Sequence, residues 1–281
     1  MILVADSGST NTDWLILENN QIKSSFTTKG FNPYFTSSKK MQIDLEAELP
    51  KNFENGKVEQ VYFYGSGCSM ESMQELIYKG LKIVFTESKI DVNHDLLGAA
   101  RALFKNEAGI VLILGTGANT CFYDGNSIIK NIPSLGFILG DEGGGDYLGK
   151  LFLTDLLYHN LPESISKRFF EKYELTESLI MQKVYKEEHP NRFLASICEF
   201  IYDNSSEEYI NNLIQKSFTD LFERHIIKYE NFTNYKIRAV GSVAYYFKDF
   251  LNEVARRYNT NIDLIIKKPI QELANYHLDS I

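Results

Sequence analysis

Two adjacent carboxylates stand in a glycine-rich stretch near the middle of the chain, where residues 140–145 read Gly-Asp-Glu-Gly-Gly-Gly. Glycine permits positive φ angles and lets a ligand approach the main chain closely. The oxygens of Asp141 and Glu142 can therefore accept hydrogen bonds from hydroxyl groups or bind a metal ion. This pattern favours a polyhydroxy ligand or a metal over a purely structural role.

Two further turns rich in glycine, serine and threonine occur where strands are expected to end. Residues 6–12 read Asp-Ser-Gly-Ser-Thr-Asn-Thr, and residues 115–120 read Gly-Thr-Gly-Ala-Asn-Thr. Backbone N–H groups and hydroxyls in such turns can surround phosphate oxygens, and Asp6 can hold a water molecule bound to Mg²⁺. Either turn alone also fits an ordinary polar hairpin. All three segments together predict a phosphate-handling enzyme.

A further carboxylate, Asp95, opens a predicted helix over residues 95–104 and follows a strand expected at residues 81–85. An acid at this position can stabilise the helix start by about 1 kcal/mol. It can equally serve as a general base toward a substrate hydroxyl, provided that it lies within reach of that hydroxyl. Both interpretations remain open for Asp95 on its own.

Two weaker signals complete the set of candidate binding residues. Gly241 and Ser242 follow an apolar run, and a glycine there would let a base or ribose lie on the backbone, although a plain turn explains the pair as well. Asn32, before a proline, offers a donor and an acceptor to a sugar. Ordinary turn chemistry explains Asn32 equally well.

The elements that must position these residues form two similar series. Hydrophobic periodicity in the first series predicts strands at residues 2–5, 14–17, 21–27, 61–64 and 81–85, with helices at 37–48, 69–80 and 95–104. The second series predicts strands at residues 110–114, 120–123, 127–132, 237–240 and 262–266, a helical region from 146 to about 224, and helices after Ser242 and Pro269.

This weak internal duplication predicts an α/β protein of two domains. The boundary is expected near residues 106–108, which gives an N-terminal domain at 1–106 and a C-terminal domain at 107–267. A helical insertion at about 150–230 belongs to the second domain, and a C-terminal helix at about 268–281 is expected to pack back on the first. Two such halves facing each other would hold a nucleotide between them.

Composition narrows the function classes. The 281 residues carry a formal net charge of -8, which argues against a broad nucleic-acid or anionic-membrane surface but leaves room for a nucleotide. Three widely spaced cysteines without a Cys-x-x-Cys pair argue against zinc or iron–sulfur sites and indicate a reducing, cytoplasmic setting. The chain opens with a strand-like run rather than a signal peptide, and its apolar runs are too short to span a bilayer.

Together these residues resemble the sugar kinase/heat-shock-protein-70/actin superfamily. The similarity is greater to the N-acetylglucosamine kinase branch, which is grouped with the BadF/BadG/BcrA/BcrD ATPases, and it spans nearly the whole chain. Asp95, followed by Gly98, matches the branch's catalytic aspartate. The matching segments are residues 6–12 for the first phosphate loop, 115–119 for the second, 140–144 for the Gly-Asp-Glu-Gly sugar loop and 241–242 for the adenosine motif.

The resemblance implies an actin-like ATPase fold, with two ribonuclease-H-like domains flanking a nucleotide cleft that closes over MgATP and an amino sugar. Asp95 is the implied catalytic base, and a homodimer is a further implied property. The implied ATP and magnesium residues are Asp6, Gly8, Ser9, Thr10, Asn11, Thr12, Gly115, Thr116, Gly117, Gly241 and Ser242, with Asp6 holding Mg²⁺ through water. The implied sugar residues are Asn32, Gly117, Ala118, Asn119, Asp141 and Glu142.

The chain departs from the branch pattern in two places. The first loop of the branch reads Asp-Gly-Gly-Gly-Thr-Lys-Thr, whereas here only Gly8 keeps a glycine and Asn11 replaces the lysine. One positive charge near the phosphates is therefore missing. A glycine–tryptophan pair before the sugar loop is replaced by Ser134 and Leu135, which alters one wall of the sugar pocket.

The sequence therefore predicts ATP-dependent phosphorylation of an N-acetylated amino sugar at its 6-hydroxyl. N-acetylglucosamine is the first candidate and N-acetylmuramate the second. Two alternatives come from other classes: an activator ATPase that drives a partner enzyme through an iron–sulfur cluster, and a sugar- or nucleotide-binding regulator without turnover. The cysteine pattern argues against the activator. The acids at Asp6 and Asp95 argue against the regulator.

Overall fold

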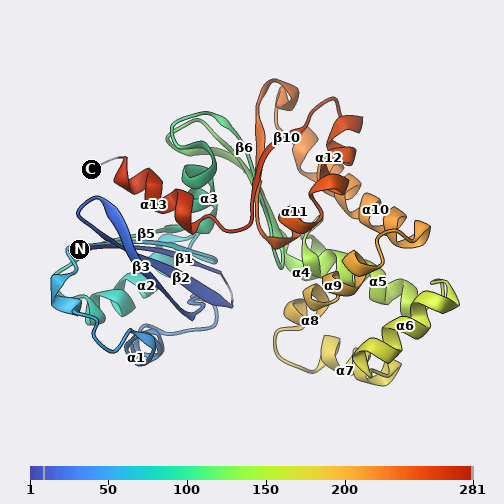
Figure 1. The fold of residues 1–281 in the computed structure, drawn as a ribbon, viewed down its shortest axis with the longest axis horizontal. Coiled ribbons are helices and arrows are strands. Elements are labelled where there is room, and N and C mark those ends of the chain that lie inside the picture. The colour runs from blue at the N-terminus through green and yellow to red at the C-terminus, as the bar shows by residue number, and fades with distance from the viewer. Residues whose placement is uncertain (9, 280–281) are drawn as a thin grey trace. The chain divides into compact units, whose positions relative to one another are not determined.

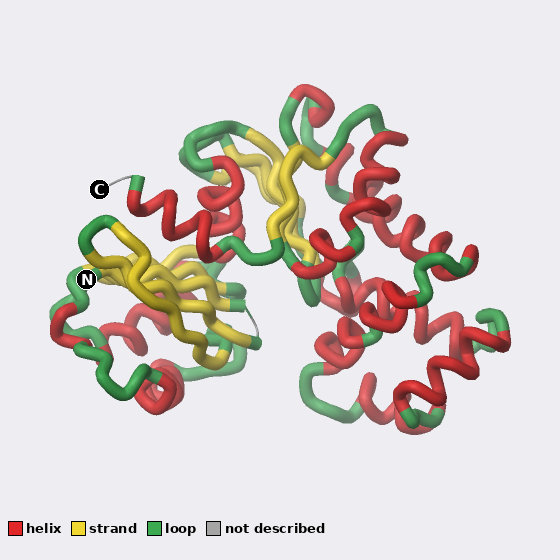
Figure 2. The backbone as a smooth tube through the Cα atoms, viewed as in Figure 1, coloured by secondary structure: helices red, strands yellow, loops and turns green. Residues whose placement is uncertain are grey.

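The computed structural model describes residues 1–8 and 10–279, and the chain divides into two compact units. The first, here called the N-unit, comprises Met1–Glu107, Asp124–Ile128 and Lys268–Ile281. The second, the C-unit, comprises Ala108–Tyr123 and Ile129–Lys267. Each unit contains a five-stranded sheet with helices packed against it (Figures 1 and 2).

The N-unit sheet has the strand order β3-β2-β1-β4-β5. Its central strand, β1, pairs antiparallel with β2 and parallel with β4, and β4 pairs parallel with β5. The carboxyl ends of the three parallel strands therefore meet at one edge, where Ser7, Gly65 and His94 lie in register. The strands are β1 (Ile2–Ser7), β2 (Asn11–Glu18), β3 (Gln21–Lys29), β4 (Gln60–Gly65) and β5 (Lys89–His94).

Helices cover both faces of the N-unit sheet, because side chains alternate along its strands. In β1, Leu3 and Ala5 join the core under α1 and α2, whereas Val4 joins the core under α3 and α13. The C-terminal helix α13 thus packs beside α3, as Figure 1 shows. The helices are α1 (Ser38–Glu48), η1 (Asn55–Lys57), α2 (Glu71–Val84), α3 (Asp95–Phe104) and α13 (Ile270–Leu278).

The C-unit sheet has the matching order β10-β9-β6-β7-β8. Its central strand, β6, pairs antiparallel with β7 and parallel with β9, and β9 pairs parallel with β10. Ile113 of β6 and Val240 of β9 lie in register, so the turns after these two strands emerge at the same edge. The strands are β6 (Gly109–Leu114), β7 (Ala118–Tyr123), β8 (Ile128–Ile132), β9 (Ile237–Val240) and β10 (Ile262–Ile266).

A mainly helical segment between β8 and β9 joins the sheet residues in one apolar core, to which Leu112, Phe152, Phe169 and Phe218 contribute. The helices of the C-unit are α4 (Gly136–Leu139), α5 (Gly145–Leu157), α6 (Glu163–Tyr173), α7 (Glu177–Tyr185), α8 (Pro190–Ser196), α9 (Cys198–Asp203), α10 (Glu208–Arg224), η2 (Ile226–Lys228), η3 (Phe232–Asn234), α11 (Ser242–Tyr246) and α12 (Lys248–Arg257). Among the described helices, none combines the length and apolar character that a membrane crossing requires.

The matching strand orders confirm the predicted α/β fold with two related halves and a helical insertion in the second. One predicted strand is wrong: residues 81–85 form the last turn of α2 and its cap, and the next strand is β5. Leu81 and Val84 are buried on one helix face at a spacing of three residues. A short apolar run suits a strand or a helix equally well, which explains the error.

Candidate active site

The first phosphate-loop candidate is the turn between β1 and β2. The backbone N–H of Gly8 donates to the carbonyl oxygen of Asn11 over 3.0 Å, and this hydrogen bond closes the turn. Gly8, Thr10 and Asn11 are exposed, so their backbone and side-chain groups are available to a ligand. Ser9, also predicted to bind ATP, lies outside the described residues.

Thr12 behaves differently from the rest of this loop, because its side chain is fully buried. Its hydroxyl donates to the carbonyl oxygen of Lys29 over 2.9 Å and lies 2.8 Å from the hydroxyl of Ser7. The Ser7 hydroxyl in turn accepts a hydrogen bond from the backbone N–H of Phe31. Thr12 therefore holds the base of the turn, and a direct contact of Thr12 with a phosphate remains a prediction.

Three acids gather at the carboxyl edge of the N-unit sheet. Asp6 lies directly opposite Asp13 in the β1–β2 ladder. Burial raises the pKa of Asp6 to about 7, the negative charges of Asp95 and Asp13 add to the effect, and Lys268 opposes it. The ammonium group of Lys268 lies 2.7 Å from Asp13 Oδ2. A positive charge, missing from position 11, is thus present near this loop from another part of the chain.

These acids suit a bound cation, since mutual repulsion of carboxylates is relieved by a positive ion. Among the groups that act on Asp6, only Lys268 offsets its negative charge, and a bound cation would do the same. Three or more His, Cys, Asp or Glu side chains in metal-binding geometry do not occur together in the described part of the chain. A Mg²⁺ ion at Asp6 would therefore take most of its ligands from water and phosphate oxygens, as this ion commonly does.

Asp95 is the first residue of α3 and directly follows β5. Its Oδ1 atom is buried and accepts no hydrogen bond from the described residues, although Nε2 of His94 lies 3.1 Å away. The positive end of the helix dipole stabilises a carboxylate here. Gly98, one turn later, lets α3 approach the sheet, because a Cβ atom there would lie 2.9 Å from the Tyr64 side chain.

The second phosphate-loop candidate connects β6 and β7, and the adenosine motif lies against its start. The N–H of Gly115 donates to the carbonyl oxygen of Gly117 over 3.0 Å. Gly241 has a φ angle of 125°, and a Cβ atom there would lie 2.1 Å from the Leu114 carbonyl oxygen. Only glycine fits this position. The structure thus brings the predicted residues of these two motifs together within the C-unit.

The start of α5 ties the sugar-loop candidate to the same phosphate loop. The N–H groups of Gly145 and Asp146 donate to the carbonyl oxygens of Gly115 and Thr116 over 2.9 and 2.8 Å. Within the sugar loop, the N–H of Gly144 donates to the Asp141 carbonyl oxygen over 2.8 Å. A ligand at the sugar loop would therefore lie next to one at the phosphate loop.

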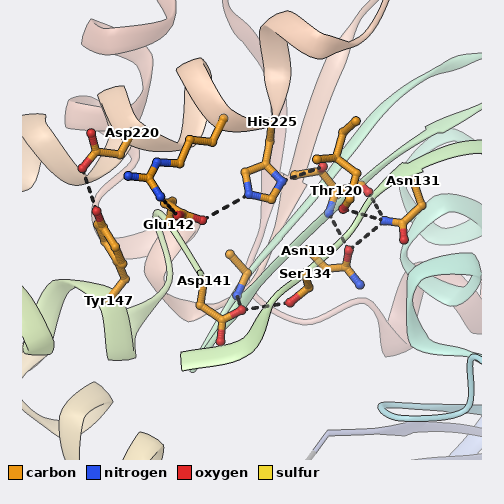
Figure 3. A network of polar contacts seen from close by, with 12 residues as sticks. Asn119, Thr120, Asn131, Ser134, Asp141, Glu142, Tyr147, Asp220 and His225 are labelled. Atoms are coloured by element: carbon orange, nitrogen blue, oxygen red, sulfur yellow. Dashed lines mark hydrogen bonds and ion pairs between the residues drawn. The ribbon is translucent and has the colours of Figure 1, made fainter. Parts of the chain in front are cut away.

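Asp141 is the best-anchored acid of this loop. It is 7% exposed and has a φ angle of 62°, a conformation that Asp and Asn tolerate better than most residues. Its Oδ1 accepts hydrogen bonds from the hydroxyl of Ser134 over 2.9 Å and from the N–H of Ala118 over 3.3 Å (Figure 3). A Cβ atom on Gly117 would lie 2.6 Å from Asp141 Oδ2, so glycine is required beside this carboxylate.

Asn119 lies on β7 close to this group and is oriented by a second asparagine. Its side-chain oxygen accepts hydrogen bonds from the side-chain amide of Asn131 and from the N–H of Thr120, each over 2.9 Å (Figure 3). With its oxygen bound to the protein, Asn119 presents its amide NH₂ group as a donor for a ligand.

Glu142 points away from Asp141 toward α10 and is 3% exposed. Its Oε1 accepts a hydrogen bond from Arg224 over 2.7 Å, and its Oε2 lies 3.3 Å from Nε2 of His225 (Figure 3). Both oxygens thus have protein partners. These contacts fix the sugar loop to the helical segment, and a direct contact of Glu142 with a sugar remains a prediction.

Asn32, the predicted sugar residue of the N-unit, lies in the turn after β3 and is half-buried. Its side-chain oxygen accepts a hydrogen bond from the N–H of Tyr34 over 3.0 Å. A Cβ atom on Gly67 would lie 2.8 Å from the same oxygen, so Gly67 allows Asn32 to pack closely there.

No family model matches the chain, and no curated protein matches it. Among solved structures, a putative N-acetylglucosamine kinase from Porphyromonas gingivalis has 35% sequence identity to this chain, covers 99% of both chains and gives a TM-score of 0.95. The chain belongs to the N-acetylglucosamine kinase-like family of the sugar kinase/Hsp70/actin superfamily.

More distant structures share the fold of this N-acetylglucosamine kinase-like protein. A putative N-acetylglucosamine kinase from Chromobacterium violaceum has 12% identity over 98% of both chains, with a TM-score of 0.72. A ROK-family glucokinase from Streptomyces griseus, solved with glucose and AMPPNP, has 12% identity over 98% of both chains, with a TM-score of 0.52. These likenesses confirm the actin-like ATPase fold and carry no further argument.

Sequence reasoning missed several residues that shape the site of this N-acetylglucosamine kinase-like protein. From the sequence, Ser134 was expected only to alter one wall of the sugar pocket, yet its hydroxyl donates a hydrogen bond to Asp141. Asn131 could have been noticed, because it lies on the strand after Asn119. Arg224 and His225 stand some eighty positions after their partner Glu142, and no local pattern connects them.

Proposed function

We propose that this protein transfers the γ-phosphoryl group of ATP to the 6-hydroxyl of an N-acetylated amino sugar, first N-acetylglucosamine and second N-acetylmuramate. One observation in the C-unit carries the proposal: α5 hydrogen-bonds the sugar loop to the second phosphate loop through Gly115 and Thr116. A sugar bound at the first of these loops and a phosphate bound at the second would therefore lie side by side. Membership of the family supports the same reading.

Sugar binding is assigned to Asp141 and Asn119, with Asn32, Gly117, Ala118 and Glu142 as further candidates. The carboxylate of Asp141 is fixed by Ser134 and Ala118 and accepts hydrogen bonds from sugar hydroxyls through its remaining lone pairs. The amide NH₂ of Asn119 donates to a sugar oxygen or to the acetamido carbonyl. Because both groups are pre-oriented by the protein, little ordering is left to occur on binding.

Phosphate binding is assigned to the two glycine-containing turns. In the N-unit, the exposed residues Gly8, Thr10 and Asn11 bind phosphate oxygens, and Ser9 and Thr12 are further candidates. Gly115, Thr116 and Gly117 do so from the C-unit, and Gly241 and Ser242 support the nucleoside. Mg²⁺, when bound, would offset negative charge on the phosphate oxygens, and Asp6 is the residue to hold it through water.

Asp95 is assigned as the general base. The Asp95 side chain is 23% exposed, and its carboxylate accepts the proton of the sugar 6-hydroxyl. As that proton moves to Asp95, the sugar oxygen forms a bond to the γ-phosphorus, and the bond between this phosphorus and the bridging oxygen of ADP breaks. Catalysis of this kind depends mainly on positioning and on charge stabilisation.

The test is a coupled ADP-release assay with MgATP and a panel of acceptors: N-acetylglucosamine, N-acetylmuramate, N-acetylmannosamine, glucosamine, glucose, pantothenate and none. Release that depends on one acetamido sugar supports the proposal and names the substrate. Release without an acceptor favours the activator ATPase. Sugar binding by calorimetry without any release favours the regulator.

The cysteines weigh against the activator. Cys68 and Cys121 are fully buried, and burial raises the pKa of the Cys68 thiol to about 12. The thiolate is the form that binds iron. A buried thiol that resists ionisation is therefore a poor ligand for an iron–sulfur cluster.

A further inference from the structure

A buried carboxyl group that the proposed mechanism does not use stands at the start of α5. Asp146 is 1% exposed, and its backbone N–H donates to the carbonyl oxygen of Thr116 over 2.8 Å. Neither of its side-chain oxygens accepts a hydrogen bond from any residue that the structure describes. An ionised carboxylate in such a place is strongly unfavourable, because burial without donors removes the hydration of the charge.

The surroundings of Asp146 add a second reason against its ionisation. Asp141 acts on Asp146 as a neighbouring negative charge and as a side-chain hydrogen-bond partner, Lys150 lies one turn later on α5, and Asp146 in turn acts on the Cys198 thiol of α9. The Lys150 ammonium group donates to the Phe137 carbonyl oxygen over 2.9 Å, and Cys198 donates to that of Gly145 over 3.3 Å. Burial and the Asp141 charge raise the pKa of Asp146 to about 9, which Lys150 only partly offsets.

We propose that Asp146 is a neutral carboxylic acid at physiological pH and donates its proton in a hydrogen bond to the Asp141 carboxylate. Two carboxyl groups this close cannot both carry a charge without a donor or cation between them, so one retains a proton. Ser134 and the Ala118 N–H already donate to Asp141, which makes Asp141 the hydrogen-bond acceptor of the pair and Asp146 the donor. Asp146 is thus a positioning residue.

Its consequence for the reaction rests on the proposed function. Asp141 then accepts hydrogen bonds from Ser134, from the Ala118 N–H and from Asp146 at the start of α5. These donors fix the orientation of its carboxylate, and therefore the direction in which its remaining lone pairs face the sugar. The neutral state also matters for the phosphates. Asp146 is bonded through its backbone to Thr116, and a second negative charge beside this loop would repel ATP.

The proton can be tested without any activity measurement, by comparing the thermal stability of wild type and Asp146→Asn across pH. An asparagine mimics the neutral acid in shape and can donate to Asp141. The unfolded chain ionises Asp146 above about pH 4, whereas the folded chain keeps the proton up to about pH 9. Wild type therefore loses stability relative to the variant as pH rises through this window.

The expected result is a Tm difference near zero at pH 4 that grows to about 4 °C or more in favour of Asp146→Asn at pH 7 to 8. The control is Asp124→Asn in the β7–β8 turn, where N–H donors at Ser127 and Asn126 lower the pKa of the acid. Asp124 is ionised above about pH 4 in both the folded and the unfolded chain, so the Tm difference for this variant should stay nearly constant from pH 5 to 8. A protonated-carboxyl infrared band at pH 7, lost in Asp146→Asn, provides the direct signature.

Kinetics separate the positioning role from a merely structural one. Asp146→Ala removes the donor and should raise the sugar KM by about 10-fold with a smaller change in kcat, whereas Asp146→Asn should restore most of that loss. A pH-independent Tm difference, or an Asp146→Asn variant as impaired as Asp146→Ala, would overturn the inference. If no sugar is phosphorylated at all, the proposed function fails while the stability and infrared results still decide the protonation state.

Discussion

The acids of the two units are held in opposite ways. In the N-unit, the buried oxygen of Asp95 accepts no hydrogen bond from the described residues, and burial raises the pKa of Asp6 to about 7. In the C-unit, Asp141 and Glu142 are buried, and their carboxylates are held by Ser134, Ala118, Arg224 and His225. Acids left without protein donors suit a moving proton or an ion, whereas anchored acids suit the recognition of a fixed pattern of hydroxyls. Under the proposed function, the acids of the N-unit serve the phosphoryl transfer and those of the C-unit bind the sugar.

The largest expected effect is on the chemical step. Asp95→Asn keeps the size of the side chain and removes its basicity, so kcat should fall by at least about 100-fold. The sugar KM and the Tm should change little, because the amide has the shape of the carboxylate that it replaces. Glu71→Gln, at the exposed acid that opens α2, is the control and should leave kcat unchanged. If Asp95→Asn turned over like wild type, Asp95 would not be the base.

Variants of the sugar-binding acid should have a smaller effect than Asp95→Asn. That effect should appear in the sugar KM rather than in kcat. Asp141→Asn tolerates the positive φ angle and removes the charge, so the sugar KM should rise by about 10- to 100-fold, the range for charge-assisted hydrogen bonds. Ser134→Ala removes one donor to the same carboxylate and should raise KM by about 5-fold. An unchanged KM in both variants would remove Asp141 from the sugar site.

A pair of glycine variants tests the packing beneath the anchored acid. Gly117→Ala places a methyl group 2.6 Å from Asp141 Oδ2, so it should destabilise the fold by about 1–3 kcal/mol and raise the sugar KM. Gly115→Ala, two positions earlier, meets nothing within 4 Å and should leave the free energy of unfolding nearly unchanged. Equal stability losses in urea unfolding would contradict this account.

The last comparison concerns how the stability of each unit responds to pH. Burial lowers the pKa of His277 to about 4, and the Arg101 charge adds to the effect, while the ring of His277 contacts the Tyr64 hydroxyl at 2.9 Å. The unfolded chain takes up this proton below about pH 6.5, so wild type should lose stability as pH falls from 6.5 to 4, by up to about 3 kcal/mol. His277→Gln should flatten that loss. The direction is opposite to that expected for Asp146 in the C-unit.

Much of the fold followed from local patterns in the sequence. Glycine-rich turns after apolar runs located the ends of β1 and β6, and the repeated strand triplet predicted two related sheets. The strand β5 was missed, because Ile90 and Val92 alternate with polar residues that weaken the apolar signal. The neighbouring run at residues 81–85 carried the stronger apolar signal but serves a helix face.

The site could be predicted only as far as its local motifs reach. Asp141 and Gly117 were identified because each stands in a glycine-rich segment. The roles of Thr12, Glu142 and Asp146 depend on partners from other elements: the carbonyl oxygen of Lys29, the side chains of α10 and the Asp141 carboxyl group. Contacts of this kind arise from tertiary packing, and a single sequence contains no signal for them.

The most direct test of the central claim is the identity of the phosphorylated product. The protein would be incubated with MgATP and N-acetylglucosamine, and in parallel with N-acetylmuramate, and the products followed by phosphorus and carbon NMR. The account predicts a sugar 6-phosphate formed in equal amount to ADP, and almost none with Asp95→Asn. A phosphate on the anomeric oxygen, or ADP formed without any phosphorylated sugar, would contradict it.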